Sequence, residues 1–253
     1  MTTEKRLRWV PLEANPDIFN SWAASMGLDT DKLAYHDIYG TDDDLLQFIP
    51  QPVQAVLLLF PNYHKTIDSF RSELDSQSAE QTQPQAHVDA ASPSSTEPPL
   101  IWFKQTIGNA CGTIGLLHSV TSSGPYARDC LKPDSPYQKL IAEVTSLPPI
   151  ERAKYLETFE PLHSTHATAA QGGQTSAPQA DDDAPLHFVC FVRHNKSLFE
   201  LDGNFRGPLD HKVAVETQED LLKVAVQWIQ KNLMQRYPES HEFNMIALAP
   251  VQS

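Results

Sequence analysis

The sequence predicts a layered domain of mixed helix and strand, of the α/β or α+β class. Segments with helical periodicity at 16–26 and 217–236 are intermingled with short apolar runs at 53–60, 186–192 and 243–248, which suit strands. Hydrophobic residues make up 40% of the 253 positions, and charged residues 20%, which is enough apolar material for a sizeable core.

The first helix has a clear start and end. Asn15 can cap the helix with its side chain, Pro16 suits the first helical position, and Gly27 suits the end. Apolar residues recur between them at helical spacing, at Ile18, Phe19, Trp22 and Met26.

The later elements follow from apolar runs. VQAVLLLF at 53–60 lies between prolines and predicts a buried strand, and FNMIAL at 243–248 predicts a closing strand. A long helix is expected from Thr217 to Arg236, with its apolar positions at Leu221, Leu222, Ala225, Trp228, Ile229 and Leu233.

A short block around Cys111 is the first chemical signal. Gly108 and Asn109 interrupt the apolar strand expected at Leu100–Phe103, and a helical pattern begins at Cys111. With Asn109 as the N-cap, Cys111 falls in the first turn, where unpaired N–H groups and the helix dipole favour the thiolate. Gln105 could supply a donor to the oxyanion hole together with the Cys111 N–H. The alternative is a buried core cysteine at a loop–helix junction.

The two other cysteines lack this context. Cys190 lies in an apolar strand and suits core packing, and Cys130 has no motif around it. Three cysteines without metal-ligand spacing predict a reduced, intracellular protein in which one thiol is used chemically. We expect no metal and no cofactor.

A histidine and an aspartate can be paired through a hairpin. His187 is the only polar residue in the strand at 186–192, and SLFEL at 197–201 predicts the next strand, ending at Asp202-Gly203. A two-residue turn at His194-Asn195 would place His187 directly opposite Asp202, where the carboxylate could orient the imidazole as a general base. The alternatives are a half-buried strand histidine and a turn-forming Asp-Gly.

Two other histidines are candidate metal ligands by their spacing. His163 and His166 are three residues apart, but no third ligand follows nearby. The spacing therefore favours a solvated helix end over a metal site.

Two segments differ from the rest in composition. Residues 76–99 are rich in Ser, Gln, Pro and Ala, which predicts a disordered surface insertion. Residues 170–185 look similar, and they suit either an interdomain linker or a functional loop.

The charge limits the partners. With 19 Lys+Arg against 32 Asp+Glu, the formal net charge is −13, which argues against nucleic acid and anionic membranes and favours a basic protein or peptide. No apolar stretch reaches the length of a membrane span, and the N-terminus lacks the apolar core of a secretory signal.

The motifs together closely resemble the ubiquitin carboxyl-terminal hydrolases of the short, single-domain kind. The resemblance covers essentially the whole chain, so a single catalytic domain over residues 1–253 is expected. The cysteine block is the part most specific to the family. The matching blocks are RWVPLEANP (8–16), DIYG (37–40), QPVQAVLLLFP (51–61), QTIGNACGTIGLLHSV (105–120), ERAKYLE (151–157), HFVCFV (187–192), LFELDG (198–203) and FNMIAL (243–248).

The resemblance implies a papain-like cysteine peptidase fold, with a central antiparallel sheet between helices and a knotted chain. It implies Cys111 as nucleophile, His187 as base and proton donor, and Asp202 as the residue that orients it. Gln105 would help to form the oxyanion hole. A crossover loop at about 160–184 would arch over the site and limit which leaving groups pass.

The same resemblance implies the substrate and the partners. The expected reaction removes small or unfolded adducts from the C-terminal glycine of ubiquitin, with Glu13, Asp37 and Phe243 as substrate-binding residues. Glu13 and Asp37 could equally be solvated carboxylates, and Phe243 could be core packing. A ubiquitin-binding or ubiquitin-stabilising protein with slow turnover is the alternative, and a general papain-like protease is a weaker third. We expect a monomer in the cytoplasm, with the nucleus as a second compartment, and ubiquitin or a ubiquitin-like relative as partner.

Overall fold

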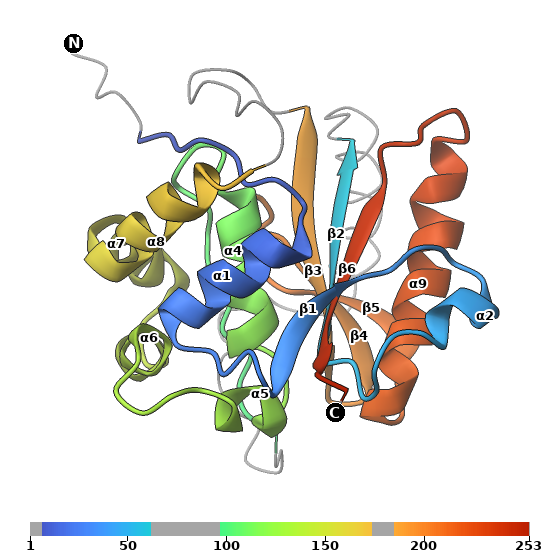
Figure 1. The fold of residues 1–253 in the computed structure, drawn as a ribbon, viewed down its shortest axis with the longest axis horizontal. Coiled ribbons are helices and arrows are strands. Elements are labelled where there is room, and N and C mark those ends of the chain that lie inside the picture. Colours follow the sequence, from blue (N-terminus) through green and yellow to red (C-terminus); the bar gives the residue numbers. More distant parts are fainter. Residues whose placement is uncertain (1–6, 62–96, 174–184, 253) are drawn as a thin grey trace.

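Six strands form one antiparallel sheet in the order β1-β6-β2-β3-β4-β5 (Figure 1). The computed structural model describes residues 7–61, 97–173 and 185–252. The sheet confirms the predicted antiparallel arrangement flanked by helices. The strands are β1 (Leu33–Asp37), β2 (Ala55–Pro61), β3 (Leu186–His194), β4 (Ser197–Leu201), β5 (Leu209–Ala214) and β6 (Asn244–Pro250).

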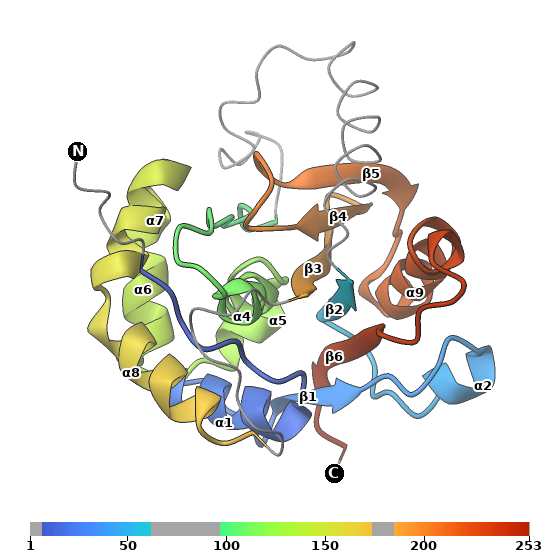
Figure 2. The same ribbon diagram turned by 90° about the horizontal axis from the view of Figure 1, so that it is seen from above.

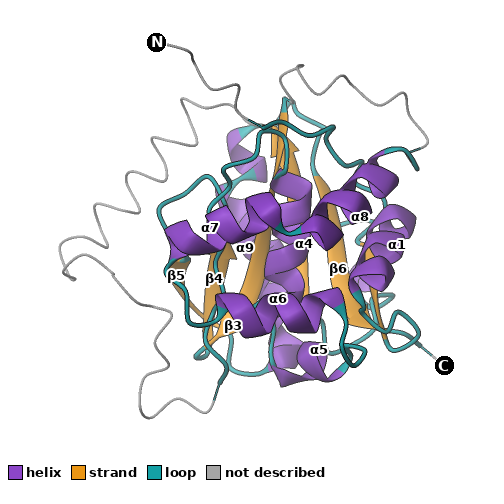
Figure 3. Ribbon diagram, turned by 90° about the vertical axis from the view of Figure 1, so that its left-hand side faces the viewer, coloured by secondary structure: helices purple, strands orange, loops and turns teal. Residues whose placement is uncertain are grey.

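The helices cover the sheet unequally. Figures 1 and 2 show α4 against one face, with α1, α6, α7 and α8 arranged around it, and α2 and α9 on the other face. Figure 3 shows this outer group from its own side. The bounds on the α4 side are α1 (Pro16–Met26), α4 (Cys111–Thr121), α5 (Pro125–Asp129), α6 (Pro136–Val144), α7 (Pro149–Thr158) and α8 (Glu160–Ala170). On the other face are α2 (Asp43–Leu46) and α9 (Leu221–Asn232), the latter between the short 3₁₀ helices η1 (Gln218–Asp220) and η2 (Met234–Arg236).

Strand β2 is apolar throughout because both of its faces are covered. Along β2, Leu57 belongs to the core under α4, whereas its neighbours Val56 and Leu58 belong to the core under α9. Alternate side chains of a strand point to opposite faces, so a strand between two helical layers needs an unbroken apolar run. This explains the continuous pattern at 53–60.

Several predicted elements are confirmed within a few residues. Helix α1 has Asn15 as its N-cap, whose side chain accepts the Asp17 N–H at 2.9 Å, and Gly27 ends it with a φ of 101°. The predicted closing strand corresponds to β6, and the predicted long helix to η1, α9 and η2. No helix among the described residues is long and apolar enough to cross a membrane.

The strand predicted at Leu100–Phe103 is wrong. These residues are buried and irregular, and side chains of α4 take the place of a partner strand. Ser122 Oγ bonds both the N–H and the carbonyl of Ile101 at 3.0 Å, and His118 Nε2 accepts the Phe103 N–H at 2.9 Å. A buried backbone group needs a partner, and here that partner need not be another strand.

The two unusual segments lie largely outside the described residues. Only 97–99 of the predicted insertion at 76–99 are described. Of the crossover loop predicted at about 160–184, the part Glu160–Ala170 is helix α8 instead of loop, and 174–184 lie outside the described residues. Helix α8 packs against α1, and its buried residues Leu162, His166 and Ala169 recur at helical spacing.

Candidate active site

Cys111 is the first residue of helix α4 and is buried. Its placement confirms the prediction, but the N-cap is Ala110 and not Asn109. Asn109 has a φ of 59°, a left-handed conformation that Asn tolerates and that turns the chain just before the helix. The sulfur therefore lies at the helix N-terminus, where the dipole favours an anion.

Helix α4 packs closely against the sheet. A Cβ on Gly115 would lie 2.9 Å from Leu57 Cδ2, so any larger residue would displace that leucine side chain. The contact brings the start of α4 to the end of β3 that carries His187. Gly115 thus lets the nucleophile helix pack closely on β2 and on β3, the strand of the base.

His187 and Asp202 meet as predicted, although the hairpin register differs. The turn is Asn195-Lys196, with φ values of 47° and 61°, and His194 pairs with Ser197. Left-handed conformations at both turn positions are typical of the type I′ hairpin. Moving the turn by one residue shifts the pairing by two, so by strand alternation His187 and Asp202 are diagonal neighbours on one face instead of direct partners.

The imidazole is held by a short hydrogen bond. His187 Nε2 donates to Asp202 Oδ1 at 2.7 Å, and the two side chains are only 5% and 2% exposed. The same carboxylate oxygen accepts the Asn204 N–H at 2.8 Å, which fixes the acceptor. Cys111 lies beside the His187 ring, close enough that each group shifts the pKa of the other. The structure thus brings together the three residues predicted as the triad.

The pKa values of the pair move in opposite directions. Burial by itself raises the pKa of the Cys111 thiol, but the hydrogen bond and charge of His187 outweigh it and the net pKa is below 9.0. Burial lowers the pKa of His187, but the Asp202 charge and hydrogen bond raise it to about 10. Both shifts favour the thiolate–imidazolium pair over the neutral thiol and imidazole.

These directions predict a bell-shaped pH profile of kcat/KM. Below the lowered pKa of Cys111 the thiolate gains a proton, so activity falls as the solution becomes more acidic. Above about 10 His187 loses the proton that it must give to the leaving group, so activity falls again. Steady-state rates across pH would check this, and a rate that keeps rising above pH 10 would contradict the assigned role of His187.

Gln105 hydrogen-bonds and packs against the loop that carries Asp202. Its backbone N–H donates to the Gly203 carbonyl at 2.8 Å, and its side-chain Nε2 donates to the Ile107 carbonyl at 3.2 Å. A Cβ on Gly203 would lie 2.8 Å from Gln105 Cβ, so glycine is required there. The predicted oxyanion donor is buried and lies six residues before Cys111 in the sequence.

Two supporting residues were missed from the sequence. His118 lies two turns after Cys111 on the same side of α4 and accepts the Phe103 N–H, and burial lowers its pKa to about 3, so it is neutral. Trp102 Nε1 donates to the Asp202 carbonyl at 3.0 Å. The seven-residue spacing from Cys111 to His118 would have placed both side chains on the same side of the predicted helix.

The prediction of a solvated helix end at His163 and His166 is wrong. Both rings pack on Trp9, and His166 is buried. Within the described ranges no group of three or more potential ligands could hold a metal ion. Cys190 is fully buried in β3, as predicted for core packing.

Two of the three predicted substrate-binding residues, Asp37 and Phe243, lie toward the catalytic end of the sheet. Phe60 pairs with His187 in β3, and the chain of Phe243 enters β6 beside it, since Asn244 pairs with Leu59. Asp37 ends β1 opposite Ile246.

Their environments differ. Phe243 is half-buried and packs near Tyr237, so it also serves the core under α9. Glu13 accepts a hydrogen bond from Asn15 Nδ2 at 3.3 Å. It follows Leu12, whose side chain lies against Gly112, the residue after the nucleophile.

Comparison with known proteins decides the family. The family model described as ubiquitin carboxyl-terminal hydrolase, family 1, matches residues 9–235. The chain belongs to this family. Ubiquitin carboxyl-terminal hydrolase 3 of Arabidopsis thaliana is 36% identical over 242 residues, which cover 96% of this chain and 94% of the relative. A ubiquitin carboxyl-terminal hydrolase of Aplysia californica is 32% identical over 235 residues, covering 92% and 97%.

Solved structures agree on the fold of this ubiquitin carboxyl-terminal hydrolase. The catalytic domain of Trichinella spiralis UCH37 bound to ubiquitin vinyl methyl ester gives a TM-score of 0.66 at 19% identity, covering 96% of each chain. The longer UCH37 chain with the same ligand gives 0.65 at 19% identity, covering 96% of this chain and 83% of that one. These likenesses support the α/β fold of the hydrolase.

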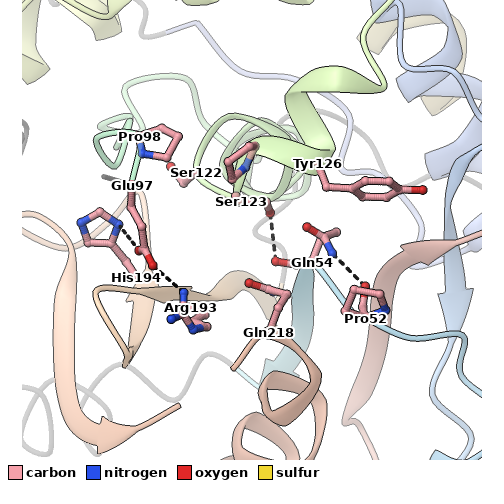
Figure 4. Close-up of a pocket in the computed structure, with 12 residues that line it drawn as sticks. Pro52, Gln54, Glu97, Pro98, Ser122, Ser123, Tyr126, Arg193, His194 and Gln218 are labelled. Carbon is pink, nitrogen blue, oxygen red and sulfur yellow. Dashed lines mark hydrogen bonds and ion pairs between the residues drawn. The ribbon is translucent and has the colours of Figure 1, made fainter. Parts of the chain in front are cut away.

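A pocket of about 280 Å³ lies at the other end of β3 (Figure 4). Glu97 fixes one wall by accepting Arg193 Nη1 at 2.6 Å and the Asn195 N–H at 2.7 Å. Ser123 Oγ, at the end of α4, donates to the Gln54 carbonyl at 3.0 Å. Because these polar groups bond to one another and the pocket is remote from His187, we assign it no part in catalysis.

Proposed function

We propose that this hydrolase cleaves the bond that follows the C-terminal glycine of ubiquitin, with Cys111, His187 and Asp202 as its triad. One observation carries the proposal: a cysteine at a helix start lies beside an imidazole that a buried carboxylate holds at 2.7 Å, close enough for cysteine and imidazole to shift each other's pKa. This is the arrangement that nucleophilic catalysis by a thiolate needs.

The reaction proceeds in two halves. The Cys111 thiolate attacks the glycyl carbonyl, and Gln105 with the Cys111 N–H donates to the oxyanion. As the C–N or C–S bond to the adduct breaks, His187 gives its proton to the leaving amine or thiol. Neutral His187 then takes a proton from water, the hydroxide adds to the thioester, and ubiquitin leaves with a free carboxylate while Cys111 returns to thiolate.

The acidic surface near the site suits the basic tail of ubiquitin. Partial burial raises the pKa of Asp37, and the nearby charge of Asp17 adds to the effect. A nearby cation, such as an arginine of the ubiquitin tail, would stabilise the charged form of this partly buried carboxylate. Tyr39, two residues on, is 78% exposed and offers an apolar contact beside it.

Asp37→Asn is expected to raise KM about five-fold for a ubiquitin substrate, with kcat nearly unchanged, because one surface ion pair is lost. Asp31→Asn is the matched control, since Asp31 is exposed and precedes the other end of the same strand. Steady-state kinetics at low and high salt would check this. Equal effects of the two substitutions would remove Asp37 from the binding surface.

Release of a fluorophore from the ubiquitin C-terminus separates this proposal from its alternative. A hydrolase turns over many equivalents, whereas a ubiquitin-binding or ubiquitin-stabilising protein gives affinity with slow turnover. Cys111, His187 and Asp202 already lie together in the structure without ubiquitin, which supports turnover. Binding without turnover would refute the proposed activity.

The leaving groups, the path of the chain, the oligomeric state and the cellular location are further parts of this proposal. We propose small or unfolded leaving groups, selected by the chain that follows α8, and a knotted path of the chain. The protein would act as a monomer without a cofactor, in the cytoplasm and the nucleus, where its three free cysteines stay reduced. A ubiquitin-like relative would be a second substrate.

A further inference from the structure

A buried cluster of Trp9, Thr113 and His166 joins three parts of the chain that meet beside the nucleophile. Trp9 comes from the N-terminal segment, Thr113 from the first turn of α4, and His166 from α8. The His166 ring stacks on the Trp9 ring with centroids 4.1 Å apart and an interplanar angle of 30°. Thr113 lies two residues after Cys111.

Both ring nitrogens of His166 are used. Nε2 lies 2.9 Å from the Val10 carbonyl, which can only accept, so Nε2 carries the proton. Burial lowers the pKa of His166 to about 4, so the ring is neutral and Nδ1 accepts the Thr113 hydroxyl at 2.7 Å. The ring thus has one fixed tautomer, and it bonds the N-terminal segment on one side and the nucleophile helix on the other.

Thr113 differs from the other buried threonine of its helix. Thr121 Oγ1 donates to the Leu117 carbonyl at 2.8 Å, the bond back to residue i−4 that a threonine commonly makes within a helix. Thr113 instead donates out of the helix to α8. The hydroxyl therefore joins two helices, and its removal would release the first turn of α4 from α8.

The N-terminal segment also holds the turn before the nucleophile. The Trp9 N–H donates to the Gly108 carbonyl at 2.9 Å, and the Gly108 N–H donates to the Leu7 carbonyl at 2.9 Å. Through Trp9, the cluster therefore contacts the chain on both sides of Cys111: Gly108 before it and Thr113 after it.

We propose that His166 is a positioning residue for Cys111, acting through Thr113 and Trp9. It fixes the first turn of α4, and with it the sulfur, relative to α8, from which the chain leaves at Ala170 and re-enters the described structure just before His187. This inference rests on the proposed role of Cys111. Small displacements of a nucleophile cost large factors in rate, so loosening this turn should affect kcat first.

Thr113→Val tests the proposal with little change in volume. We expect kcat for ubiquitin–fluorophore hydrolysis to fall about ten-fold with KM within about two-fold, because the sulfur is less well placed. Thr113→Ser keeps the hydroxyl and should restore most of the rate. Thr121→Val is the matched control, since it makes the same change at the far end of the same helix and should leave kcat near wild type.

Alkylation of Cys111 by iodoacetamide gives a second readout that needs no ubiquitin. Thr113→Val should shift the pH dependence of this alkylation toward higher pH, whereas Thr121→Val should not. His166→Phe, which keeps a ring on Trp9 but loses both ring hydrogen bonds, should behave like Thr113→Val. The double variant should be no slower than the slower single one.

The outcomes separate the two claims. If Thr113→Val matches Thr121→Val in both kcat and alkylation, the cluster is packing alone and the inference is wrong. If the wild-type protein fails to hydrolyse ubiquitin substrates, the proposed function is wrong, and the alkylation comparison still decides whether His166 and Thr113 position the thiol.

Discussion

Cys111→Ala is expected to reduce turnover of a ubiquitin–fluorophore substrate by at least about 10⁴-fold, to the background rate. The substitution removes the sulfur that forms the thioester, and no other group can replace it. Ubiquitin affinity should stay within a few-fold of wild type, because the side chain is small and buried. Stopped assays for activity and titration of labelled ubiquitin for binding would measure the two effects separately.

Cys130→Ala is the matched control for this change. Cys130 is also buried, but burial and its surroundings raise its pKa, and it lies after α5, on a part of the chain that does not contact His187. It should retain near wild-type turnover. Residual turnover in Cys111→Ala well above background would exclude Cys111 as the nucleophile.

Asp202→Asn is expected to lower kcat on the order of 10²- to 10³-fold with KM little changed. The amide oxygen can still accept from His187 Nε2, but the negative charge that raises the pKa of His187 is gone. The imidazolium and, with it, the thiolate lose stability, so the acid limb of the pH profile should move to higher pH.

Asp210→Asn provides the comparison, because Asp210 is a partly buried carboxylate on β5 that bonds Ser197 and Lys212 instead of a catalytic group. Its kcat should be close to wild type. An effect of Asp202→Asn that is confined to KM, or that equals the effect of Asp210→Asn, would make Asp202 a binding or structural residue.

The triad could be predicted from the sequence because local rules place it. Helical spacing starts at Cys111, and strand alternation puts His187 and Asp202 on one face. The predicted hairpin turn lies one residue too early, which shifts the strand pairing by two positions. A shift by an even number keeps each side chain on its face, so His187 and Asp202 still lie on the same face. Asn195-Lys196 both adopt left-handed conformations, and a lysine there gives no sequence signal.

The features that were missed depend on contacts between distant segments. The segment at 100–103 has the composition of a strand, but Ser122 and His118 satisfy its backbone, and no local pattern reveals that. His166 looked solvated because its partners, Trp9, Val10 and Thr113, are far from it in sequence. Glu160–Ala170 was assigned to a loop by resemblance, although its buried positions follow a helical period.

The proposed reaction requires that Cys111 is the nucleophile that attacks the C-terminal carbonyl of ubiquitin. The most direct measurement treats the protein with ubiquitin carrying a C-terminal vinyl methyl ester and maps the modified residue by mass spectrometry. We predict a single adduct on Cys111, formed rapidly and slowed by Asp202→Asn. An adduct on Cys130 or Cys190, or no adduct under conditions where the protein is folded, would contradict the account.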